Sequence, residues 1–167
     1  MLASLVASLV HLCAPWNAFY ADSRVAETVV VSVHLVAMMI GGGIAIATDR
    51  DTLRATRTAI GMGPEVLERL HGTHRPVLMA LSVLLLSGLA LATADIKTFA
   101  TSPIFLIKMM LVALLTINGA VLVRTEQRLR RGDAAEVLWN RLRRSTRFSL
   151  ALWVCVVIAG ATLVNAG

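Results

Sequence analysis

The residues best suited to chemistry in this chain begin with one histidine inside an apolar run. Residues 25–48, VAETVVVSVHLVAMMIGGGIAIAT, contain His34 and three successive glycines, Gly41 to Gly43. Met38 lies one helical turn after His34 and Gly41 lies seven residues after it, so a helix would place all three on one stripe. An imidazole, a thioether and a gap made by glycine are what a haem or metal pocket between helices requires.

Two further histidines, His71 and His74, are separated by three residues, which puts both on one face of a helix. Such a pair can bind one metal ion, or supply one haem ligand and a spare. Equally, they can be interfacial side chains beside Arg75 in a basic, water-accessible segment. On ideal helices His74 lies about 15 Å from His34 along the helix axes, too far to share one haem unless the helices are staggered or tilted.

Several other residues could complete a site at the level of His34. Met110, Met38 and His11 are candidate partners, and methionine together with histidine also suits copper(I). Lys108 could bind haem propionates, or extend its ammonium to the nearby interface. Methionine is often flexible packing, and His11 is equally explained as an interfacial histidine that faces lipid headgroups.

Composition excludes several classes of protein. Hydrophobic residues make up 57% of the 167 residues, which favours a membrane protein over a soluble domain. The net charge of +6 does not indicate nucleic acid, because thirteen of the sixteen basic residues lie in residues 50–75 and 124–147. Two cysteines cannot build a disulfide framework, and Cys155, in an apolar run, is predicted to be buried. Without a CxxCH motif, any haem is expected to be held non-covalently.

The apolar segments predict an all-α membrane protein. Four segments are long enough to cross a bilayer as helices, which needs about 20 residues. They are residues 25–48, 75–95, 103–123 and 148–165. Pro64 and Pro103 are placed to open the second and third helical segments. Because short connections make successive helices antiparallel neighbours, residues 21–167 are expected to form an up-down four-transmembrane-helix bundle.

The flanking segments predict the rest of the architecture. Residues 2–14 are apolar but too short to cross a bilayer, Pro15 ends this run, and Trp16, Phe19 and Tyr20 are typical of a membrane interface. We expect residues 1–20 to be a short interfacial or re-entrant helix. Two basic loops are predicted, one after residue 51 and one over residues 124–147, the latter containing the start of the last helix. The positive-inside rule then makes the basic side cytoplasmic and places both termini outside.

Parts of the sequence resemble a known family. VHLVAMMIGGG resembles the histidine-bearing first helix of the copper-resistance D-type membrane domain and of related uncharacterised bacterial four-span families. SPIFLIKMMLVALLTINGAVLVR places Lys108 and Asn118 where those families have a lysine and an asparagine, and RLRRSTRFSLALWVCVVIAGATLVNAG is similar to their basic loop and final helix. The resemblance covers residues 25–166 and does not include the His71–His74 pair. It implies copper uptake or resistance, or haem binding, since some relatives look like b-type cytochromes.

Three functions remain open. The first is a multi-pass electron-transfer protein of the bacterial inner membrane that binds haem b and is expected to be a subunit of a larger complex rather than an independent enzyme. There His34, with His74 or His71, would supply ligands, Gly41 and Gly42 clearance, and Lys108 a cation for the propionates. The second is a copper-handling or copper-transport protein, and the third is a structural subunit without a cofactor. The expected partners are the lipid bilayer and other membrane-complex subunits or a redox protein.

Overall fold

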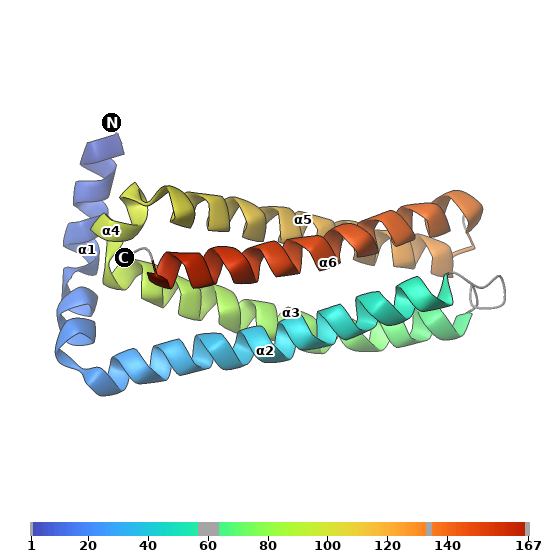
Figure 1. Cartoon of the computed structure of the whole chain (residues 1–167), viewed down its shortest axis with the longest axis horizontal. Coiled ribbons are helices and arrows are strands. Elements are labelled where there is room, and N and C mark those ends of the chain that lie inside the picture. The colour runs from blue at the N-terminus through green and yellow to red at the C-terminus, as the bar shows by residue number, and fades with distance from the viewer. Residues whose placement is uncertain (1, 57–63, 133–134, 166–167) are drawn as a thin grey trace.

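The computed structural model describes residues 2–56, 64–132 and 135–165, and every regular element in these ranges is an α-helix. The long helices are α2 (Arg24–Ala55), α3 (Pro64–Ala94), α5 (Pro103–Arg130) and α6 (Ala135–Asn165), and the shorter ones are α1 (Leu2–Asp22) and α4 (Ile96–Thr101). Figure 1 shows the four long helices side by side, with α1 lying across one end. The predicted all-α class is therefore confirmed for the described residues.

The two ends of the bundle differ in what they contain. The helices α1 and α4 lie together with the last turns of α6 at one end, which we call the α1 end (Figure 1). The helices α2 and α5 finish at the opposite end, where α3 and α6 begin, and we call this the basic end because most of the arginines belong to it.

Each of the four long helices contains an apolar stretch that is long enough to cross a membrane. Most side chains on these stretches face away from the other helices, and the exposed fractions of Met79, Leu86 and Ile117 are 69%, 68% and 61%. So large an apolar surface is unfavourable in water and fits a lipid bilayer.

Cys155 is also exposed. The prediction that it is buried is wrong, because apolar sequence alone does not separate lipid-facing from bundle-facing positions.

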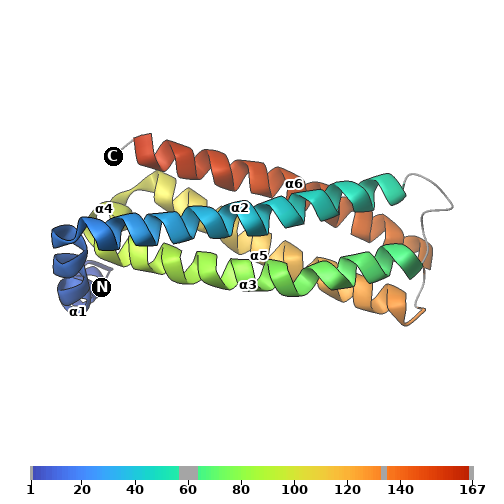
Figure 2. The same ribbon diagram turned by 90° about the horizontal axis from the view of Figure 1, so that it is seen from below.

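The bundle is built from two closely packed helix pairs. The helix α2 packs chiefly on α3, and α5 packs chiefly on α6, while contacts between α2 and α6 join the pairs (Figure 2). Small residues allow the close approach, since a Cβ added to Gly41 would lie only 2.8 Å from the Cβ of Ala80. A Cβ added to Gly42 would lie 3.2 Å from the Trp153 ring. Gly41 therefore serves the α2–α3 contact and Gly42 the α2–α6 contact.

Two helix starts agree with the sequence. The helix α3 begins at Pro64 and α5 at Pro103, as predicted. Proline fits a first turn because it lacks the N–H that this turn leaves unpaired. The Ser102 hydroxyl accepts a hydrogen bond from the Phe105 amide at 3.3 Å and so caps α5.

The segment predicted as an interfacial helix corresponds to α1. It runs through Pro15 without ending and finishes two residues beyond the predicted boundary at residue 20. The Trp16 indole N–H donates a hydrogen bond of 2.9 Å to the Ala90 carbonyl. This bond attaches α1 to the last turns of α3.

At the basic end the long helices continue beyond the predicted spans. Residues 49–55 belong to α2, residues 124–130 belong to α5, and α6 begins at Ala135, so most of the predicted basic loops is helical. A helix of 32 residues is about 48 Å long, whereas a hydrocarbon core is about 30 Å thick. A buried apolar cluster stabilises this end by amphipathic packing. It comprises Leu67, Leu70, Leu122, Leu129, Leu138, Trp139 and Leu142.

The contact at Gly41 predicts an unequal response to alanine along α2. Gly41→Ala should lower the free energy of unfolding by about 1–3 kcal/mol, because its methyl group would overlap Ala80. Gly43→Ala is the matched control, since no atom lies within 4 Å of its added Cβ. Thermal unfolding in detergent measures both, and Ala80→Gly should restore much of the loss in Gly41→Ala. Equal destabilisation by Gly41→Ala and Gly43→Ala would contradict this account.

Candidate functional site

His34 is a half-buried side chain at the interface of α2 and α3. Its Nδ1 atom lies 2.9 Å from the hydroxyl oxygen of Ser87, which is buried on α3. The carbonyl of Leu84, one turn earlier on α3, also interacts with the imidazole. The ring is therefore held in one orientation by polar groups of the neighbouring helix.

The hydrogen bonds of Ser87 fit a proton on Nδ1 of His34. The Ser87 hydroxyl lies 2.7 Å from the Val83 carbonyl, to which it can donate its single proton. In that arrangement the Ser87 oxygen accepts a hydrogen bond from His34 Nδ1–H. A neutral imidazole protonated at Nδ1 carries a lone pair at Nε2. Metal-bound histidines commonly donate their other ring N–H in this way, so His34 has the arrangement of a ligand.

Lys108 on α5 lies close enough to His34 for an electrostatic interaction. Its ammonium lies over Gly160 of α6, where an added Cβ would be 3.5 Å from Nζ. A Cβ added to Gly88 of α3 would likewise lie 3.3 Å from His34 Cε1. Each glycine thus leaves room for one of the two polar side chains. We call this group the histidine cluster, and it comprises His34, Ser87, Gly88, Lys108 and Gly160.

The other residues proposed for a site at the level of His34 are placed differently. Met38 is half-buried on α2, one turn after His34. Met110 exposes 56% of its surface on α5, and His11 is exposed on α1. The space in front of Gly41 is filled by protein atoms, as is that in front of Gly42. Of the predicted site residues, the structure therefore brings together His34 and Lys108, and gives both glycines a packing contact.

His71 belongs to a separate group near the basic end. Its Nδ1 atom lies 3.7 Å from a carboxylate oxygen of Glu126, which is completely buried, and Arg130 lies 3.5 Å from the same oxygen. The side chain of His74 lies outside the part that the structure describes. Its backbone is thirteen residues from Ser87 on α3, about 20 Å along the helix. Since metal–imidazole bonds are about 2 Å long, this register separates His74 from a metal on His34.

The described side chains also limit the kind of metal site that the protein could form. Among the side chains that the structure describes, no group of three or more His, Cys, Asp or Glu residues could hold a metal ion. A site assembled from several such ligands is therefore not formed by them. Haem iron needs at most two axial ligands from protein, so this finding does not address a haem on His34.

A second set of polar residues lies buried toward the basic end. Asn118 of α5 donates to the Ser145 carbonyl at 3.0 Å and accepts from the Ser145 hydroxyl at 2.7 Å, so it links α5 to α6. Asp49 of α2 is buried and hydrogen-bonds with Ser149 of α6. The sequence of α6 does indicate a polar face at this level, because Ser145 and Ser149 are one helical turn apart and share a face.

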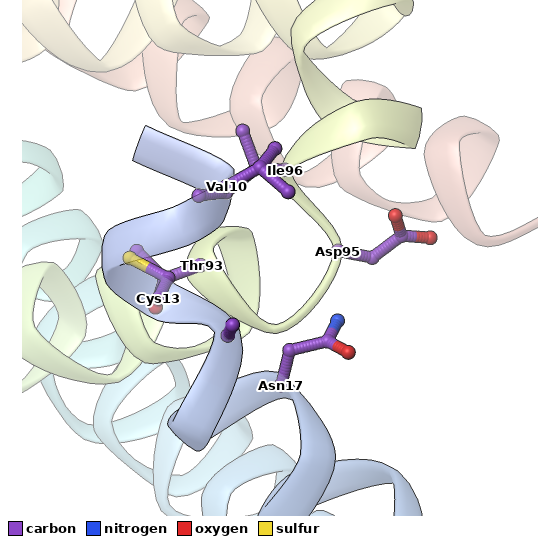
Figure 3. A pocket seen from close by; sticks show the side chains of 7 residues that line it. Val10, Cys13, Asn17, Thr93, Asp95 and Ile96 are labelled. Carbon is purple, nitrogen blue, oxygen red and sulfur yellow. The ribbon is translucent and has the colours of Figure 1, made fainter. Parts of the chain in front are cut away.

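A small pocket lies at the α1 end between α1, α3 and α4. Figure 3 shows Cys13 and Asn17 from α1 facing Thr93 and Asp95 across it. The Asn17 amide donates a hydrogen bond to the Ala94 carbonyl beside the pocket. The volume of this pocket, about 200 Å³, is below the roughly 300–1,000 Å³ of most small-molecule sites. The histidine cluster is therefore the stronger candidate site.

Comparison with protein-family models, with curated proteins and with solved structures found no match to this chain.

The Asn118–Ser145 pair predicts a measurable coupling between α5 and α6. The single variants Asn118→Ala and Ser145→Ala should each destabilise the protein, because each leaves a buried partner without its hydrogen bond. A double-mutant cycle of unfolding in detergent should give a coupling free energy of roughly 0.6 kcal/mol, typical of interhelical hydrogen bonds in membranes. Thr116→Ala is the control, since Thr116 is exposed and donates within its own helix. Additive effects of the Asn118 and Ser145 changes would exclude the coupling.

Proposed function

We propose that this protein is an integral membrane electron-transfer protein that binds haem b through His34 and works as a subunit of a larger membrane complex. The observation that carries the proposal is the 2.9 Å hydrogen bond between His34 Nδ1 and the Ser87 hydroxyl, which can donate its own proton to the Val83 carbonyl. It directs the Nε2 lone pair of His34 to a ligand role. A bound haem would supply one-electron transfer at this position.

The surroundings of His34 supply two further functions that a haem needs. Lys108 provides a cation beside the imidazole, where it would pair with the carboxylates of the haem. Ser87 fixes the ring orientation and raises the basicity of the ligating nitrogen. The resemblance of residues 25–166 to four-span families that include cytochrome-like members is consistent with these roles.

The proposed subunit role follows from the number of ligands around His34. Met110 and His11 are exposed, and the register of α3 separates His74 from His34. Met38 is on the same helix, one turn from His34, so both side chains would approach a haem from one side and a second ligand would come from a neighbouring subunit. The long apolar faces of the helices offer room for such a neighbour within the bilayer.

We further propose that the four long helices cross the bacterial inner membrane in an up-down arrangement, with the basic end in the cytoplasm and both termini outside. The distribution of arginine supports this orientation through the positive-inside rule. The helix α1 lies across the end opposite the arginines, so in this orientation it would lie at the outer interface (Figure 1).

Absorption spectra test the haem proposal. The detergent-purified protein, isolated with its native partners, should show a sharp α-band after reduction with dithionite. His34→Ala should abolish this band. Ser87→Ala should weaken haem binding by about 10–100-fold, because the hydrogen bond between Ser87 and His34 Nδ1 is lost. His71→Ala is the control and should retain the band, since His71 contacts Glu126 instead.

A band that survives in His34→Ala would contradict the ligand assignment. No band in any preparation, together with stoichiometric copper that is lost in His34→Ala, would instead favour the copper-handling function. Neither cofactor in protein taken with its partners would favour a structural subunit.

Thiol labelling tests the orientation. In a variant with serine at both native cysteines, Leu12→Cys and Val137→Cys place single thiols at exposed positions of α1 and α6. A membrane-impermeant reagent added to intact cells should label Leu12→Cys but not Val137→Cys, and disruption of the cells should allow both to react. The reverse pattern would invert the topology.

A further inference from the structure

One face of α6 carries three arginines that have a common environment. Arg141, Arg144 and Arg147 are all exposed and are spaced three residues apart. At 100° and 1.5 Å per residue they lie within about 120° of the helix circumference and about 9 Å of its length. Arg143 differs, because its guanidinium turns inward and donates a hydrogen bond to the Thr56 carbonyl of α2. The three exposed arginines therefore form one cationic patch on the outer side of α6.

The same face becomes apolar directly after this patch. Phe148, Val154 and Ile158 are exposed, with exposed fractions of 48%, 55% and 59%. Ala151 lies between them and is also exposed. The face is therefore cationic at Arg141 to Arg147 and apolar from Phe148 to Ile158, and we call the apolar part the apolar track. The helix α6 lies at the edge of the bundle (Figure 2).

Little negative charge on α6 opposes the patch. Glu136 is the single acidic residue in Ala135–Asn165, and it lies at the first turn, where it favours the helix N-terminus. The patch thus keeps its positive charge and leaves its guanidinium groups available. Guanidinium binds phosphate through paired hydrogen bonds, which makes arginine well suited to recognise it.

We propose that this face of α6 binds an anionic phospholipid, with the phosphate headgroup at Arg141, Arg144 and Arg147 and an acyl chain along Phe148, Ala151, Val154 and Ile158. The change from cationic to apolar character at Arg147 and Phe148 matches the boundary between the headgroups and the hydrocarbon of a bilayer.

The apolar track decides between a lipid and other anionic partners. Nucleic acid or a soluble acidic protein would use the arginines but would not cover Val154 and Ile158. A phospholipid satisfies both segments at once, because its charge and its hydrocarbon are joined in the required order. The proposal does not depend on haem binding, so a failure of one leaves the other intact.

Lipid binding to the delipidated full-length protein in detergent tests this proposal. The probes are cardiolipin and phosphatidylglycerol, with phosphatidylcholine as the neutral lipid and inorganic phosphate as the headgroup alone. Native mass spectrometry counts the bound lipids and gives their affinities. The two anionic lipids should bind and phosphatidylcholine should bind far more weakly.

The triple variant Arg141→Gln/Arg144→Gln/Arg147→Gln should weaken anionic lipid binding about 100-fold, since each arginine near an anionic surface contributes about 1 kcal/mol. Arg50→Gln/Arg54→Gln/Arg69→Gln is the matched control, because it removes the same charge from exposed positions on α2 and α3. It should keep most of the affinity. Circular dichroism verifies that both variants remain helical.

A second variant probes the acyl chain separately. Val154→Asn/Ile158→Asn keeps all the arginines and should weaken phospholipid binding without affecting binding of inorganic phosphate. Equal losses in the two arginine variants would show a diffuse charge effect and overturn the proposal. Binding of inorganic phosphate as tight as the binding of cardiolipin would also overturn it.

Discussion

The main constraint on this structure is that a bilayer offers no hydrogen-bonding partners to polar groups. The long segments are helical because a helix pairs its backbone groups within itself. Two pairs of polar side chains inside the bundle meet across helix interfaces, Asn118 with Ser145 and His34 with Ser87. The helices also lack a hydrophobic drive to associate within lipid, so their contacts depend on close approach at small residues such as Gly41 and Ala80.

The sequence predicts the parts of the fold that depend on local composition. Hydropathy identifies the four long helices, and Pro64 and Pro103 mark two of their starts, because the chemistry of a helix start is local. The extension of α5 past its apolar stretch could not be read in the same way. It depends on leucines that meet only after the helices are aligned, such as Leu67 and Leu129.

The candidate site is predictable to a similar extent. An isolated histidine in an apolar run is conspicuous, and the structure places Lys108 of another helix close enough to interact with it. Ser87 was missed because a serine among leucines carries no signal until its partner on the neighbouring helix is known. The glycines gave an ambiguous signal, since a gap suits a cofactor or an approaching helix equally well. Here Gly42 meets Trp153.

The leucine and tryptophan cluster at the basic end has a consequence for how the protein assembles. Part of this cluster lies on helix that extends past the hydrocarbon, where water restores the ordinary hydrophobic effect. The cluster joins Leu67 and Leu70 of α3 to apolar residues of α5 and α6, so the contact between the two helix pairs at this end is expected to depend on apolar burial. Burial of this kind carries a heat-capacity change, as in a soluble protein. We therefore expect cooling and urea to weaken this contact between the helix pairs.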